Sequence, residues 1–284
     1  MEVVGEMKHR KFGTHTQAVA GVIEALLMVA LVSVVISMIQ LIYIPQIMEQ
    51  KEAEHMDQVS NQVSTLKSMI DMQAMTQSSA PISSMITLGS RELPYFITSG
   101  SFGEVRTQES ITSKIDVDQG SLFVQPLTSI IYQSQNAYFV DQTYILEGGG
   151  IIVKQSTGEP VMRADPSIQV VNGSWIQINF SFPIIRGVFG KNLTSGEGKC
   201  FIRTNWSQGD TFKFPPIGSG TINSINISTQ YPNAWNESLS GMLENNVYYK
   251  EGLSYVKITR KDKDIHLRID YYYILTQIGQ GWIK

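Results

Sequence analysis

Apolar residues are concentrated in one run near the start of the chain, residues 25–44 (ALLMVALVSVVISMIQLIYI), which contains no charged side chain. A helix rises about 1.5 Å per residue, so a run of this length covers roughly 30 Å, the thickness of the hydrocarbon layer of a bilayer. The run therefore predicts a membrane-spanning helix. It is longer than the apolar core of a cleaved secretory signal, roughly 7–15 residues, and no small-x-small site follows it, so we expect a retained anchor.

Charged residues are distributed unequally on the two sides of this run. The basic residues Lys8, Arg10 and Lys11 precede it, and the acidic residues Glu49, Glu52, Glu54 and Asp57 follow it. Basic residues close to a membrane span stay in the cytoplasm. We therefore expect residues 1–17 to form a basic cytoplasmic leader and the C-terminal part of the chain to lie outside the cell.

The helical pattern continues past the apolar run to about residue 76. Beyond the predicted span, apolar side chains recur at spacings of three and four, which places them on one stripe of a helix: Met56, Val59, Val63, Leu66 and Ile70. Two interpretations are open, because the stripe could pack on the protein's own sheet or against a helix of another subunit. In both, residues 18–76 form a transmembrane and extended amphipathic helix.

Short β runs dominate the remaining sequence, residues 77–284, and predict an antiparallel, sandwich-like extracellular domain, so the expected fold class is α+β. The clearest runs are residues 95–98, 114–117, 122–124, 129–132, 137–146, 151–154, 167–171, 175–182, 199–204 and 221–228. A short amphipathic helix is expected at 234–244. The last two runs, 254–260 and 265–275, flank a polar turn and predict a hairpin, with Tyr271 to Tyr273 in a central or partner-covered strand. A stacking platform for bases or sugars is the other interpretation of these tyrosines, and the lack of a basic groove argues against it.

The composition narrows the range of functions. The net charge of −3 and the lack of a clustered basic face argue against nucleic-acid binding. Cys200 is the only cysteine, so no internal disulfide can form, and we expect it to be a small buried apolar group. The four histidines have no metal-ligand spacing, and no nucleophile elbow occurs. We therefore expect no catalytic residue, no zinc or iron site and no cofactor, and a protein that is not an enzyme. The acidic loop residues leave a calcium site open, but no D-x-D-x-D-G run locates one.

Six N-x-[ST] sequons lie in the part of the chain that we expect outside the cell, at Asn172, Asn179, Asn192, Asn205, Asn226 and Asn236. They predict either a glycan-coated surface or a Ser- and Asn-rich β domain in which few sequons are glycosylated. Asn179 lies in the middle of a predicted strand and is the least suited to modification.

Glu24 is the one carboxylate at the inner edge of the apolar run. It could extend to the lipid headgroups, or it could pair with a group such as the N-terminal amine of a neighbouring subunit. Only the second interpretation predicts that assembly fails when Glu24 is removed.

The segment QAVAGVIEALLMVALVSVVISMIQ, residues 17–40, resembles the N-terminal segment of archaeal type IV pilin-like proteins. The later run YILEGGG, residues 144–150, with the residues that follow it to Arg163, is similar to uncharacterised archaeal membrane proteins with the same start. The resemblance implies leader cleavage by a pilin-type peptidase, here between Gly13 and Thr14, and a helix that packs in a filament core. A cut at that position leaves extra residues before Gln17, so Glu24 matches the core carboxylate of the family only loosely.

Together these features predict a structural cell-surface protein that is a pilin-like subunit or minor pilin. The alternative is a membrane-tethered, adhesin-like binding module that does not form filaments. The expected partners are membrane lipid, other copies of the N-terminal helix, the leader peptidase and N-glycans.

Overall fold

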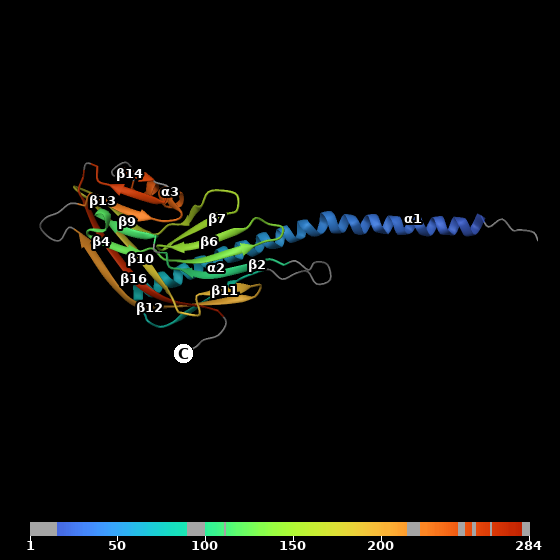
Figure 1. Ribbon diagram of the computed structural model, residues 1–284, viewed down its shortest axis with the longest axis horizontal. Helices are drawn as coiled ribbons and strands as arrows, with labels where there is room; N and C mark the ends of the chain where they lie inside the picture. The colour runs from blue at the N-terminus through green and yellow to red at the C-terminus, as the bar shows by residue number, and fades with distance from the viewer. Residues whose placement is uncertain are drawn as a thin grey trace, which may run out of the picture. The chain divides into compact units, whose positions relative to one another are not determined.

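The computed structural model describes residues 16–89, 100–110, 112–214, 222–243, 248–251, 254–261 and 263–279. In these residues the chain has one long N-terminal helical segment followed by a β-rich domain, so the predicted α+β class is confirmed (Figure 1). The chain divides into two compact units, the first ending at Glu49 and the second beginning at Gln50. The strand predicted at 95–98 lies outside the described residues.

The helical segment consists of α1 (Thr16–Met38), a π-helical turn (Ile39–Tyr43) and α2 (Ile44–Thr76). In the π turn the N–H of Ile44 donates to the carbonyl of Ile39, five residues earlier. Pro45 follows at once; it has no N–H, and its ring crowds the carbonyl of the preceding turn of an α-helix. A wider π turn accommodates such a residue without ending the helix.

The apolar stripe of α2 packs inside the second unit. Met56, Val59, Val63, Leu66 and Ile70 are each at most 3% exposed and contact side chains of two sheets. The prediction that this stripe packs on the protein's own sheet is confirmed. The alternative, contact with a helix of another subunit, is wrong for these five side chains, because they are already covered.

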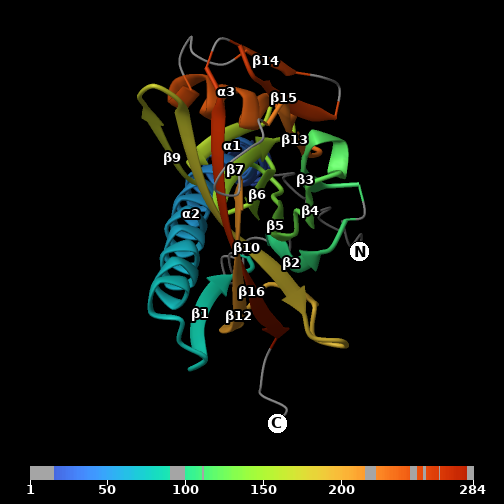
Figure 2. The same ribbon diagram turned by 90° about the vertical axis from the view of Figure 1, so that its left-hand side faces the viewer.

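Three sheets make up the described part of the β domain (Figure 2). Sheet A has the strand order β1 (Ile82–Thr87), β12 (Lys199–Phe214), β16 (Ile265–Gly279), β10 (Ile176–Gly187) and β9 (Ser167–Asn172). Sheet B has the order β11 (Leu193–Gly196), β2 (Phe102–Gln108), β5 (Ser129–Gln135), β6 (Gln142–Glu147), β7 (Gly150–Gln155) and β8 (Val161–Ala164). Sheet C has the order β14 (Tyr248–Glu251), β15 (Tyr255–Thr259), β13 (Ser224–Ser228), β3 (Lys114–Val117) and β4 (Phe123–Pro126).

The strand pairs described are antiparallel, as predicted, except that β10 and β16 run parallel. The predicted hairpin of the last two strands is wrong. β15 pairs with β13 and β14 in sheet C, whereas β16 lies between β12 and β10 in sheet A. The chain therefore passes from sheet C to sheet A between β15 and β16. The physical reason is length and burial: β16 has 15 residues with apolar side chains on both faces, and β15, with 5 residues, cannot cover them.

Two hydrophobic cores share sheets A and B. The first core lies between the three sheets and α3 (Pro232–Leu243), the predicted short helix, and contains Trp235 and Phe182. The second core contains the α2 stripe and residues of sheets A and B. Along β16, Ile265, Leu267 and Ile269 face the first core, and Tyr272, Ile274 and Ile278 face the second. The prediction that the three tyrosines lie in a central strand is confirmed.

Candidate functional site

The first unit presents an apolar helix with no protein cover. All residues from 19 to 43 are exposed, and the large apolar ones are between 43% (Ile39) and 76% (Leu41) exposed. The most apolar window of 18 residues has a mean hydropathy of 2.7, and none of it is buried. Among the described residues this is the one helix long and apolar enough to cross a membrane.

Small residues and one carboxylate lie near the start of this helix. Glu24 is exposed in α1, as are Gly21 and Ala25, which are four residues apart and therefore on one face. A Cβ added at Gly21 would meet no atom within 4 Å. This face leaves room for close approach of another helix. Gly13 and Thr14, the predicted cleavage position, lie outside the described residues.

The six sequon asparagines differ in accessibility. Asn172, at the end of β9, and Asn192, between β10 and β11, are exposed. The other four are half-buried, in strands of sheets A and C and in α3: Asn179, Asn205, Asn226 and Asn236. The Asn226 amide donates to the Asp116 carboxylate at 3.2 Å. The structure therefore favours Asn172 and Asn192 as positions at which a glycan could be attached.

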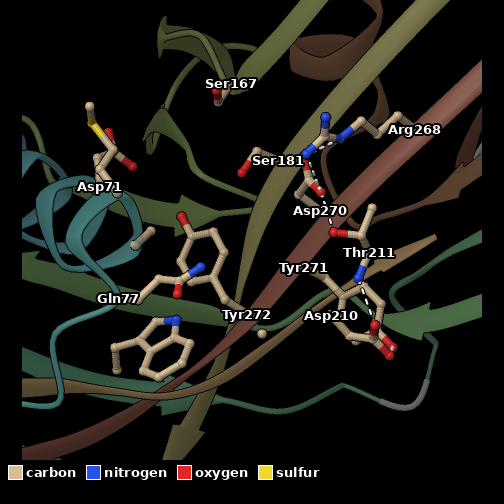
Figure 3. A pocket seen from close by; sticks show the side chains of 14 residues that line it. Asp71, Gln77, Ser167, Ser181, Asp210, Thr211, Arg268, Asp270, Tyr271 and Tyr272 are labelled. Atoms are coloured by element: carbon tan, nitrogen blue, oxygen red, sulfur yellow. Dashed lines mark hydrogen bonds and ion pairs between the residues drawn. The ribbon is translucent and has the colours of Figure 1, made fainter. Parts of the chain in front are cut away.

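A cleft of about 650 Å³ lies in the second unit, where α2 ends and sheet A continues beyond it (Figure 3). Its wall on the helix side is formed by Asp71, Ala74, Met75 and Gln77, and its floor is formed by β9, β10, β16 and β12. α2 covers the sheet as far as Tyr272. The floor is polar because, among the described residues, no helix covers the rest of this sheet face.

One row of polar side chains crosses four strands of the floor. Ser181 of β10 pairs with Ser167 of β9 on one side and with Asp270 of β16 on the other, and Asp270 pairs with Thr211 of β12. Residues that pair across strands in register lie on the same face of the sheet. Hydroxyl and carboxylate groups from four separate segments are thereby brought together.

Hydrogen bonds and ion pairs fix the acidic groups of the cleft. Asp270 accepts a hydrogen bond from the Thr211 hydroxyl at 2.6 Å and pairs with Arg268, whose Nε lies 2.9 Å from it. Asp210 accepts the Thr211 backbone N–H at 2.8 Å and the Tyr271 hydroxyl at 3.2 Å. Asp71 pairs with Lys67 at 2.7 Å. The carboxylates are thus already held by donors.

Aromatic rings form the end of the cleft nearest α2. A β-bulge between Trp206 and Gln208 adds a residue to β12, and Trp206 and Gly209 face the same side of the sheet as Tyr272. Bulges commonly re-aim a side chain in this way. Burial, with a smaller effect from Asp71, raises the pKa of the Tyr272 hydroxyl, so it remains protonated and able to donate.

Sequence reasoning missed this cleft. A signal is visible on one face of β16, where polar His266, Arg268 and Asp270 give way to Tyr272 and Ile274. This change marks where the helical cover begins. The row itself depends on strand register, which the sequence did not indicate.

Other chemistry is sparse in the described part of the chain. No group of three His, Cys, Asp or Glu side chains there could hold a metal ion. Cys200 is buried, as predicted, and burial raises the pKa of its thiol, which disfavours the nucleophilic thiolate. No protein-family model, no curated protein and no solved structure matches the chain.

Proposed function

We propose that this chain is a structural protein of the archaeal cell surface, a pilin-like subunit or minor pilin that is held in the membrane by its N-terminal helix. In this role residues 1–17 are a cytoplasmic leader, and the β domain lies outside the cell and carries N-glycans. The protein has no catalytic task. The supporting observation is the apolar helix from 19 to 43, which has no protein cover on any side.

Assembly of a filament would transfer this helix from lipid into a bundle of identical helices. Lipid and bundle are about equally apolar, so association depends on close packing at small residues and on polar pairs. Gly21 and Ala25 supply the close-packing face, and Glu24 beside them supplies the carboxylate that pairs with a neighbouring subunit. Removal of the leader between Gly13 and Thr14 by a pilin-type peptidase would precede assembly.

Paired substitutions in the helix test this role. Gly21→Leu fills the close-packing face, whereas Val22→Leu changes the adjacent position and keeps the helix apolar. We expect Gly21→Leu and Glu24→Gln to remain in the membrane but to lose surface filaments in electron micrographs, and Val22→Leu to assemble as the unaltered chain does. Filaments of normal number from Gly21→Leu and Glu24→Gln, or no filaments from the unaltered chain, would refute the proposal.

The cleft on sheet A favours a second candidate, a membrane-tethered binding module that does not form filaments. Here the helix is only an anchor, and the Ser181, Asp270 and Thr211 row faces a ligand. The two candidates separate experimentally, since a tethered module forms no filaments and Gly21→Leu leaves both its anchoring and its ligand binding unchanged. A filament subunit loses assembly with the same substitution.

A further inference from the structure

We infer that the cleft at the end of α2 binds a neutral saccharide chain. This inference goes beyond the structural role and does not require filaments, although it would give the tethered module its ligand. Ligand sites in proteins are usually concave, roughly 300–1,000 Å³ in volume, with a few convergent polar groups. The cleft has about 650 Å³ and a polar row on its floor.

The arrangement of donors and acceptors suits a polyhydroxylated ligand. Ser167, Ser181 and Thr211 offer hydroxyls, and the Gln77 amide faces them from the end of α2 (Figure 3). Hydroxyls both donate and accept, and an amide carries one donor group and one acceptor. A sugar ring presents alternating hydroxyls that match such a set, whereas a purely apolar ligand would leave these groups without partners.

The aromatic rings provide the second element of saccharide recognition. Trp206 and Tyr272 line the end of the cleft and lie on the same sheet face as the polar row. A sugar ring has one face of C–H groups, which can cover an aromatic ring while its hydroxyls reach the polar groups beside it. The polar floor can therefore bind the hydroxyls of a pyranose ring while the aromatic end contacts its C–H face.

The charges in the cleft argue for a neutral ligand. Asp270 is neutralised by Arg268 and Asp71 by Lys67, so the local charge is small. An anion would meet the Asp71 and Asp270 carboxylates, and Arg268 beside them is already paired with Asp270. The hydrogen bonds already made by Asp210 and Asp270 leave few free oxygens for a metal ion.

The same sheet face continues past the cleft and could hold a longer chain. Beyond Asp270 it presents Arg268 with Asn179, then His266 with Gln177. The His266 ring is stacked on Trp175, with ring centres 4.8 Å apart. His266 and Tyr272 are six residues apart, and a strand rises about 3.3 Å per residue, so the track is roughly 20 Å long. A glycan on Asn179 would lie over this track, so the inference requires that sequon to be unmodified.

A side chain added at Gly209 would fill the cleft next to Tyr272 and Trp206, at the edge of the second core. A Cβ built there lies 3.4 Å from the Tyr272 Cβ and 3.7 Å from the Trp206 ring, which are ordinary contact distances. Gly209→Leu therefore places a side chain beside the Trp206 ring and the Tyr272 Cβ. Gly198→Leu is the matched control, because a Cβ at Gly198 meets no atom within 4 Å. A second test variant is Ser181→Val in the polar row. Its matched control is Ser195→Val on the edge strand β11 of sheet B.

Binding is measured with the full chain in lipid nanodiscs, because detergents with sugar headgroups would compete. The probes are neutral unbranched disaccharides and tetrasaccharides of glucose, mannose, galactose and N-acetylglucosamine, titrated by calorimetry. We expect at least one probe to bind, Gly209→Leu and Ser181→Val to weaken its affinity about tenfold or more, and both controls to leave it unchanged. Trp175→Ala should weaken tetrasaccharides but not disaccharides.

Two results would overturn the inference. One is the absence of binding by every probe at millimolar concentration. The other is unchanged affinity in both Gly209→Leu and Ser181→Val while the circular dichroism of these variants shows native folding. Filament assembly is scored separately in the same variants, which we expect to assemble normally. Failure of saccharide binding and failure of the structural role are therefore told apart.

Discussion

Glu147, at the end of β6, is the buried group whose titration should govern the stability of the β domain near neutral pH. Its carboxylate is 3% exposed and accepts hydrogen bonds from the Thr229 hydroxyl at 2.6 Å and from the indole N–H of Trp235 at 3.0 Å. Burial raises the pKa of Glu147 from 4.5 to about 7, and the two hydrogen bonds offset part of that rise. The carboxyl is thus protonated in the folded chain under conditions in which it is ionised in the unfolded chain.

The sign of the effect follows from proton linkage. Between pH 4.5 and 7 the folded state holds a proton that the unfolded state has released, so the free energy of unfolding falls as the pH rises through this window. At about 1.4 kcal/mol for each pKa unit, the rise from 4.5 to about 7 corresponds to about 3 kcal/mol. Glu147→Gln removes the charge and keeps an acceptor for Trp235. We expect this variant to match the unaltered chain at pH 4.5 and to be up to about 3 kcal/mol more stable at pH 8.

Urea unfolding of the full chain in nanodiscs, followed by tryptophan fluorescence, to which buried Trp235 contributes, measures this difference at each pH. The pKa of His55 is lowered by burial, which makes stability rise with pH, but both proteins share this contribution and it cancels. Glu237→Gln, an exposed carboxylate on the same helix as Trp235, serves as the control and should show no such trend. A stability difference between Glu147→Gln and the unaltered chain that does not grow with pH would show that Glu147 is not protonated in the folded chain.

Three further substitutions or truncations test the fold. Gly148 has φ +58°, and a Cβ there would lie 2.8 Å from the Trp235 ring. Gly148→Ala should therefore lower the free energy of unfolding by about 2–4 kcal/mol, and a urea midpoint equal to that of the unaltered chain would contradict this. Glu52 is buried, and its carboxylate accepts hydrogen bonds from the backbone N–H groups of residues 137, 138 and 139 at 3.0, 2.8 and 2.6 Å. Glu52→Ala should therefore lower the free energy of unfolding by about 3 kcal/mol and speed hydrogen exchange at those amides. Glu52→Gln should lower the free energy of unfolding by less. A fragment that begins at Gln50 should be soluble and folded by circular dichroism. A fragment that begins at residue 78 should aggregate, because it lacks the α2 stripe and exposes the rest of the second core. Equal solubility of the two fragments would show that the second core does not need α2.

Local patterns in the sequence predicted the elements well where one face of each element is buried. The spacing from Met56 to Ile70 predicted a helical stripe, and the structure buries it. Alternation in residues 175–182 predicted a strand, and Ile176, Ile178 and Phe180 point into the first core. In both cases the periodicity reflects a single buried face, which is a local property of the chain.

Pairing between distant strands could not be predicted in the same way. Nearness in sequence and a polar connection suggested that β15 and β16 form a hairpin, yet they belong to different sheets. The parallel contact of β10 with β16 joins segments about ninety residues apart. The cleft depends on this contact, because the register of β10 on β16 brings Ser181 beside Asp270. A one-residue change of register would place these side chains on opposite faces.

The proposed role requires the helix from 19 to 43 to hold the protein in a membrane. Alkaline carbonate extraction of membranes from cells that make the full chain tests it most directly, because this treatment releases peripheral proteins and leaves spanning helices in the bilayer. We expect the protein to remain in the membrane pellet at pH 11 and to dissolve only with detergent. Recovery of most of the full-length protein in the carbonate supernatant would contradict the account.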